Sequence, residues 1–183
     1  MIRICVKEIK KKEHESRREA EIRVTYECLE RLGVNNKISH DFYGKPYFEE
    51  ETDLNISITH SLCWCGVAVA SKKDGFFGID VESSERKQIE KVAPRVFTAK
   101  EIQDSTGDLS KLIKLWTAKE AVFKAIDKQG INFKRDILVN ISLGNTACYR
   151  PSDVQLSLAF HNLPHNNIFC LASQCNKYEF RTL

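Results

Sequence analysis

The spacing of hydrophobic residues along this 183-residue chain predicts a mixture of strands and helices. Short alternating or continuous apolar runs, bounded by turn-forming residues, predict strands at 1–7, 55–59, 64–70, 76–82, 137–143, 154–160, 167–172 and 178–182. Apolar residues three and four positions apart predict helices at 13–32, 87–93 and 109–128. Thr98, with Glu101 three residues later, forms a capping-box pattern that predicts one more helix start.

Each half of the chain thus holds a helical part and an antiparallel part, which favours an α+β fold. We expect two similar lobes related by a pseudo-twofold, each a small antiparallel sheet packed against helices. The N-terminal lobe is predicted over 1–75 and the C-terminal lobe over 76–183. The turn sequence at 72–75 also predicts that the strands on either side of it pair as a hairpin.

Composition narrows the class of protein. Hydrophobic residues make up 42% and charged residues 29%, which is ordinary for a soluble globular protein, and no apolar run is long enough to span a bilayer. The first residues lack the basic segment and apolar core of a secretory signal. Seven cysteines occur without a Cys-x-x-Cys pair, so we expect reduced thiols in a cytoplasmic protein. A net charge of +3 is too small to predict nucleic-acid binding.

Positive charge is nevertheless concentrated between Lys7 and Arg18, with glutamates interleaved. One interpretation is a solvated helix face with salt-bridge spacing. The other is an edge that binds phosphate. The charge pattern by itself favours the first.

Two carboxylates, Asp80 and Glu82, lie two residues apart in a predicted strand, so they point to the same face. Ile79 and Val81 would then face the core. Because neighbouring carboxylates repel each other, a hard divalent cation would stabilise them. Gly78, on the same face, would leave room beside them for a bulky ligand. The alternative is a strand with one wet face.

The helix predicted over 109–128 stacks Trp116, Glu120 and Lys124 along one line. Glu120 would lie at the edge of the buried stripe, where a carboxylate needs a partner. A metal ion or Lys124 would serve. The alternative is an ordinary surface salt bridge between Glu120 and Lys124.

The order of these motifs is more specific than any one of them. The chain contains Gly44-Lys45-Pro46, Thr59-His60-Ser61, Gly78-Ile79-Asp80-Val81-Glu82, Phe97 to Glu101, and Trp116 to Lys124. In this order and spacing, over residues 43–130, it resembles the 4′-phosphopantetheinyl transferases, specifically the single-chain, two-lobed Sfp-type branch. These enzymes move the phosphopantetheine arm of coenzyme A onto a serine of a carrier protein.

The resemblance implies roles for several residues. Asp80, Glu82 and Glu120 match the three acidic residues around Mg²⁺, with Mn²⁺ as the alternative ion. Glu101 matches the glutamate proposed as the base that activates the carrier serine, although capping alone also accounts for it. Lys124 matches a lysine that contacts phosphate.

The remaining candidates concern coenzyme A. His60 and Ser61 match a pair near its phosphates, Lys45 a nucleotide contact, and Arg18 falls where the family places 3′-phosphate contacts. Lys119 would contact phosphate or face solvent in a structural role. The resemblance further implies an apo acyl or peptidyl carrier protein as partner, and a monomer that contains the whole site between its lobes.

Two other functions use the same residues. A metal-dependent phosphodiesterase acting on coenzyme A or a related nucleotide would use the carboxylates with water as the nucleophile. A non-catalytic coenzyme A or carrier-binding module would bind without transfer. In one departure from the family pattern, Asp127 stands where many relatives place a glycine.

Overall fold

The computed structural model describes residues 1–142 and 144–183. The last position of the strand predicted over 137–143 lies outside the described residues. The chain divides into two compact units: unit 1 comprises residues 1–75 and 175–183, and unit 2 comprises residues 76–174. In the described part of the chain, no helix is long and apolar enough to cross a membrane.

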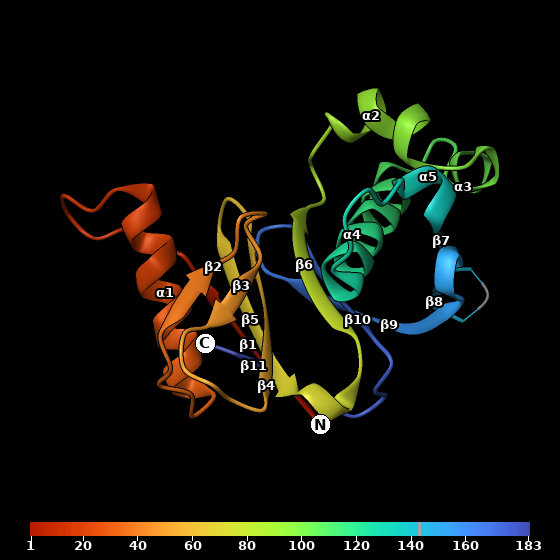
Figure 1. Cartoon of the computed structure of the whole chain (residues 1–183). Helices are drawn as coiled ribbons and strands as arrows, with labels where there is room; N and C mark the ends of the chain where they lie inside the picture. Colours follow the sequence, from red (N-terminus) through yellow and green to blue (C-terminus); the bar gives the residue numbers. More distant parts are fainter. Residues whose placement is uncertain (143) are drawn as a thin grey trace. The chain divides into compact units, whose positions relative to one another are not determined.

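Unit 1 is a four-stranded sheet with one long helix and a small hairpin (Figure 1). The strand order is β11-β1-β5-β4. The bounds are β1 (Ile2–Glu8), α1 (Arg17–Arg31), β2 (Ile38–His40), β3 (Pro46–Phe48), β4 (Leu54–His60), β5 (Trp64–Ser71) and β11 (Tyr178–Thr182). A 3₁₀ turn follows β5 at Lys72–Asp74.

Helix α1 begins four residues later than the hydrophobic spacing predicts. The Ser16 side chain accepts a hydrogen bond from the Glu19 backbone, and the Glu19 side chain accepts one from the Ser16 backbone. This capping box satisfies backbone donors that the first turn leaves unpaired, and so fixes the helix start. The buried face of α1, including Val24 and Cys28, packs against Val67 and Val69 of β5 to form the core of unit 1.

The described residues of unit 2, 76–142 and 144–174, form a five-stranded sheet with four helices. The strand order is β6-β10-β9-β8-β7. The bounds are β6 (Phe77–Ser83), α2 (Ile89–Val96), α3 (Ala99–Asp104), α4 (Leu109–Ile126), α5 (Phe133–Asp136), β7 (Ile137–Asn140), β8 (Thr146–Tyr149), β9 (Val154–Leu163) and β10 (Asn167–Ser173). A 3₁₀ turn at Arg150–Ser152 joins β8 to β9.

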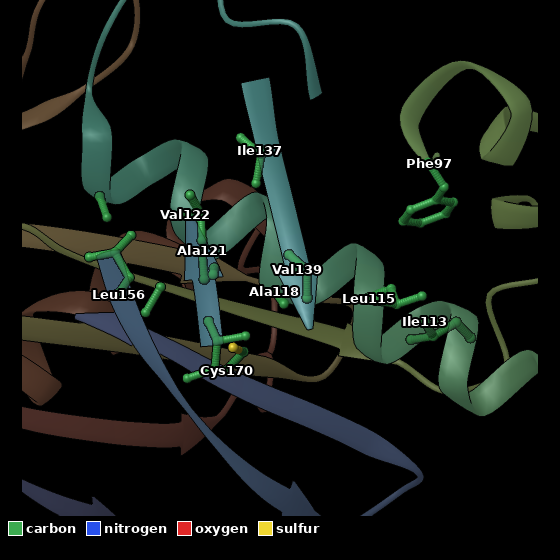
Figure 2. Packing of buried hydrophobic residues seen from close by; sticks show 14 of the residues in the cluster. Phe97, Ile113, Leu115, Ala118, Ala121, Val122, Ile137, Val139, Leu156 and Cys170 are labelled. Atoms are coloured by element: carbon green, nitrogen blue, oxygen red, sulfur yellow. The ribbon is translucent and has the colours of Figure 1, made fainter. Parts of the chain in front are cut away.

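The core of unit 2 forms where α4 packs on the sheet. Figure 2 shows Ala118, Ala121 and Val122 of α4 together with Leu156 and Cys170 of the strands. All five are buried. The small alanines let the helix backbone approach β6 and β10 closely, which makes α4 the central helix of this unit.

The two units share one strand-and-helix order. In unit 1, β1 is followed by α1, β4 and β5, and the last of these strands pairs with the first. In unit 2, β6 is followed by α4, β9 and β10, and β10 pairs with β6 in the same way. The fold is therefore α+β, with two topologically similar units, as predicted.

Two expectations need correction, and some short elements were not predicted. The predicted hairpin across 72–75 is wrong, because β5 pairs with β1 and β4, whereas β6 pairs with β10. The predicted C-terminal lobe also differs from the structure at its end, because residues 175–183 belong to unit 1, where β11 pairs with β1 in parallel. The short elements β2, β3, β8 and α5 were not predicted, since three or four residues show no period.

Candidate functional site

Strand β6 and helix α4 place the predicted carboxylates. Both faces of β6 are buried from Phe77 to Val81, so the alternative of a strand with one wet face is wrong at Asp80. A Cβ atom at Gly78 would lie 2.2 Å from the carbonyl oxygen of Ala121 and 2.5 Å from the amide nitrogen of Ala125. The absent side chain of Gly78 thus makes room for α4, and the prediction that it makes room for a ligand is wrong.

Asp80 faces α4 and pairs with its lysine. Asp80 is 5% exposed, and its Oδ1 atom lies 2.7 Å from Nζ of Lys124. The alternative salt bridge between Lys124 and Glu120 is therefore not the arrangement found. The ammonium group compensates a carboxylate that burial would otherwise destabilise.

Glu82 follows Asp80 on the same face and has two partners. Its Oε1 atom accepts a hydrogen bond of 2.9 Å from the indole nitrogen of Trp116, and it also forms an ion pair with Arg86. Burial, and then repulsion from Asp80, raise the pKa of Glu82 above its ordinary value. The two partners only partly offset these effects.

Glu120 is half-buried on α4 and forms no hydrogen bond or ion pair with the residues that the structure describes. Burial raises its pKa to about 7, and repulsion from Asp80 is the next largest cause. Glu82 adds to this repulsion, while Lys124 opposes it. The three carboxylates therefore share one electrostatic environment.

This donor set fits a hard divalent cation that is completed by a substrate. Within residues 1–142 and 144–183, no three His, Cys, Asp or Glu side chains are arranged to hold a metal ion by themselves. Mg²⁺ commonly binds through one or two carboxylates together with waters and substrate phosphates, so it does not require a complete protein cage. A cation beside Glu120 would also relieve the repulsion that raises its pKa.

Glu101 and Lys119 lie in a buried ion pair. Nζ of Lys119 lies 3.1 Å from Oε2 of Glu101, and the two side chains are 0% and 8% exposed. The capping box predicted at Thr98 is confirmed, because the Thr98 and Glu101 side chains each accept from the other's backbone. The alternative for Lys119, a side chain that faces solvent in a structural role, is therefore wrong. Burial lowers the pKa of Lys119, and Glu101 opposes that effect.

Unit 1 holds a separate pocket of about 500 Å³. Its lining includes Arg18 and Thr25 of α1, His40 of β2 and His60 of β4. The Nε2 atom of His60 lies 3.0 Å from the hydroxyl oxygen of Thr25, which fixes the orientation of the imidazole. The structure thus brings together two sequence-predicted residues, Arg18 and His60, in one pocket.

Two other predicted nucleotide contacts lie in turns. Ser61 accepts a hydrogen bond from the Trp64 amide at its Oγ atom, which closes the turn between β4 and β5. The backbone amide of Lys45 donates to the Asp41 side chain in the turn between β2 and β3. Neither Ser61 nor Lys45 is among the described residues that line the pocket of unit 1.

Comparison with known proteins identifies the family. The sequence model of the 4′-phosphopantetheinyl transferase superfamily matches residues 76–174, which are the residues of unit 2. The chain belongs to the 4′-phosphopantetheinyl transferase superfamily. It is also 30% identical over 122 residues to a 4′-phosphopantetheinyl transferase of Bacillus subtilis. That match covers 58% of this chain and 53% of the relative, so the chain spans about half the length of the relative it matches.

The superfamily assignment covers the unit that contains Asp80, Glu82, Glu120 and Lys124. The superfamily model does not match unit 1. The alignment with the Bacillus subtilis relative covers 122 residues, which is longer than unit 2, so that alignment extends into unit 1. The coenzyme A contacts predicted in unit 1 therefore stay predictions, because the superfamily model does not cover that unit.

Sequence reasoning missed three residues beside the predicted ones. Arg86 and Trp116 both contact Glu82, and His40 joins Arg18 and His60 at the pocket. Trp116 belongs to the recognised motif, but its pattern says nothing about where the indole nitrogen points. Arg86 and His40 carry no distinguishing signal in the sequence, because only the fold brings them to these positions.

Proposed function

We propose that this chain transfers 4′-phosphopantetheine from coenzyme A to a serine hydroxyl of an apo carrier protein. The serine oxygen attacks the β-phosphorus of coenzyme A, the phosphoanhydride bond breaks, 3′,5′-ADP leaves, and the hydroxyl proton of the serine is released to solvent. The products are the holo-carrier and 3′,5′-ADP, as in a holo-acyl-carrier-protein synthase of the Sfp-type branch. The observation that carries the proposal is the shared electrostatic environment of Asp80, Glu82 and Glu120 within the unit that matches the superfamily.

Asp80, Glu82 and Glu120 are proposed to hold Mg²⁺ or Mn²⁺. When bound, the cation would neutralise charge on the pyrophosphate and on the leaving group. Lys124 supports this assignment because it already lies beside Asp80 and carries a compact positive charge. In the complex, Lys124 orients Asp80 and contributes charge close to the phosphates.

The pocket of unit 1 is proposed to receive the 3′-phosphate of coenzyme A. Arg18 is exposed at this pocket, forms no hydrogen bond or ion pair with the described residues, and offers a fork of donors that suits phosphate. His60 lines the same pocket, and its contact with Thr25 sets the orientation of the imidazole. Ser61 and Lys45 follow from the resemblance, as contacts to the same nucleotide.

The decisive experiment is intact-protein mass spectrometry of apo carriers mixed with this protein, coenzyme A and Mg²⁺. The panel contains a fatty-acid carrier and a peptide-synthetase carrier, and Glu120→Gln serves as the matched control. We expect a gain of one phosphopantetheine mass that disappears with EDTA and in the control. If no carrier is modified while coenzyme A is hydrolysed, the protein is instead a phosphodiesterase. Binding of coenzyme A with neither reaction indicates a binding module.

A further inference from the structure

The Glu101 carboxylate has each of its oxygens engaged inside the protein. Oε2 accepts a hydrogen bond of 2.7 Å from the Thr98 amide and lies 3.1 Å from Nζ of Lys119. Oε1 accepts one of 3.2 Å from the Val139 amide. A general base needs to reach the proton it removes, and the surroundings of Glu101 are instead those of a structural anion.

The cavity next to Glu101 is also apart from the other carboxylates. This cavity of about 260 Å³ is lined by residues of α3, the first half of α4, β7, β8 and the loop after β7, together with Gln155 of β9. Asp80, Glu82 and Glu120 are absent from its described lining. A carrier serine that reached Glu101 through this cavity would therefore not pass Asp80, Glu82 or Glu120.

Lys119 connects Glu101 to two further elements. Its Nζ atom donates to the carbonyl oxygen of Phe133 at 2.9 Å and to that of Ile137 at 2.6 Å. With Glu101, these contacts use all three protons of the ammonium group. The ion pair thereby fixes α3, α5 and the start of β7 to α4.

The contact with α5 leads to Glu82. The ring of Phe133 stacks on Trp116, with centroids 5.9 Å apart and planes 20° apart. The Trp116 indole then donates to Glu82 at 2.9 Å. A change at the ion pair would therefore displace Phe133, then Trp116, and finally a proposed metal ligand.

We propose that Glu101 and Lys119 act together as a positioning pair that sets Glu82 through Phe133 and Trp116, and that Glu101 is not the base. This inference rests on the proposed metal site and transfer reaction. It replaces the family-derived role of Glu101 with a role in orienting a ligand. Partners that orient metal ligands typically change metal affinity by about 10–100-fold when they are removed.

The test compares Glu101→Gln, Lys119→Met, the double variant and Phe133→Leu. Binding of Mn²⁺ in the presence of coenzyme A is followed by electron paramagnetic resonance, which does not depend on turnover. Carrier modification gives kcat and the Mg²⁺ concentration for half-maximal rate. Thermal unfolding reports whether each variant is folded. Phe133→Leu leaves both charges of the pair in place, so it tests the connection even if a single charge variant fails to fold.

We expect both single variants to weaken Mn²⁺ binding by about 10-fold or more. The double variant should be no worse than either single one, because residues that act as a unit are not additive. Phe133→Leu should also weaken Mn²⁺ binding while Glu101 stays intact. The half-maximal Mg²⁺ concentration should rise in parallel in every case.

The proposal is overturned if Glu101→Gln lowers kcat by about 100-fold or more with Mn²⁺ binding unchanged and Lys119→Met remains active, because a base behaves in this way. Absence of Mn²⁺ binding by the unaltered protein also overturns it. If that protein binds Mn²⁺ and coenzyme A but modifies no carrier, the proposed transferase function fails, and the Mn²⁺ titrations of the variants still decide the positioning role.

Discussion

Gly78 of β6 faces the carbonyl oxygen of Ala121 in α4, and a Cβ atom at Gly78 would lie 2.2 Å from that oxygen. The carbonyl oxygen is part of the backbone, and a Cβ atom is bonded directly to the backbone, so neither atom can move away as the end of a flexible side chain would. This close approach sets the height of α4 above the strand that carries Asp80. The stability of unit 2 and the geometry of the proposed metal site therefore depend on the same glycine.

We expect Gly78→Ala to lower the free energy of unfolding by about 1–3 kcal/mol, because overpacking forces a backbone shift. Urea denaturation measures the change. Gly107→Ala is the control, since Gly107 has a positive φ of 77° but a Cβ atom added there would meet nothing within 4 Å. Gly107→Ala should lower the free energy of unfolding by about 1 kcal/mol, and this decrease should come from backbone strain alone. Equal unfolding midpoints for Gly78→Ala and the unaltered protein would contradict the close approach.

Glu120→Gln should remove transfer activity and yet stabilise the metal-free protein. The raised pKa of about 7 means that folding favours the protonated form of Glu120, so its ionisation destabilises the fold as pH rises from about 4.5 through 7. We expect a gain on the order of 1–3 kcal/mol at pH 8 in EDTA, and little gain at pH 4, where Glu120 is already neutral. Urea denaturation at the two pH values provides the measurement. A loss of stability at pH 8 would show that the Glu120 carboxylate has a partner in solution.

Arg17 and Arg18 form a matched pair for testing the nucleotide pocket. Arg17 donates to the backbone oxygens of Ser61 and Leu62, whereas Arg18 lines the pocket. Arg18→Ala should weaken coenzyme A binding by about 10-fold or more, the effect of losing a hydrogen bond to a charged group.

Isothermal titration with coenzyme A and with 3′-dephospho-coenzyme A separates the contributions. The Arg18→Ala effect should vanish for the dephosphorylated ligand, because the contacted phosphate is missing. Arg17→Ala should instead lower the thermal unfolding midpoint, since it disconnects α1 from the turn after β4. An Arg18→Ala effect of equal size on both ligands would place the 3′-phosphate elsewhere.

Asp127 ends α4 in a left-handed conformation, with φ of 51°. A residue with a Cβ atom is strained there, and glycine is not. Asp127→Ala should therefore lower the free energy of unfolding by about 1 kcal/mol, whereas Asp127→Gly should leave it unchanged or raise it slightly. Urea denaturation of both variants tests this, and indistinguishable values for alanine and glycine would contradict it.

The sequence predicted the long elements well, because their periods extend over many residues. Helix α4 follows the stripe of Leu112, Leu115 and Val122, and α3 begins at the predicted Thr98 cap. The ends were less accurate at α1, where Ser16 rather than the hydrophobic period fixes the start. The pairing of β5 was mispredicted because a turn sequence shows that the chain reverses or bends, but not which strand it joins.

The candidate site was likewise predicted only in part from the sequence. The sequence supplied Asp80, Glu82, Glu120 and Lys124 through strand and helix periods and through the order of the motifs. The sequence could not predict that Lys124 pairs with Asp80 instead of Glu120, because this pairing depends on how α4 packs on β6. The geometry that supports our reassignment of Glu101 likewise arises from elements that are far apart in the chain.

By itself, the sequence determined the α+β class, the superfamily and the residue types that we propose to bind a metal ion and phosphate, because local periods and motif spacing are properties of the chain itself. Only the tertiary structure decided which charges are partnered. Lys119 is buried against Glu101, while Glu120 has no partner among the described residues. The physical reason is that the stability of a charge depends on its burial and on neighbours brought close by packing, and neither is a property of sequence spacing.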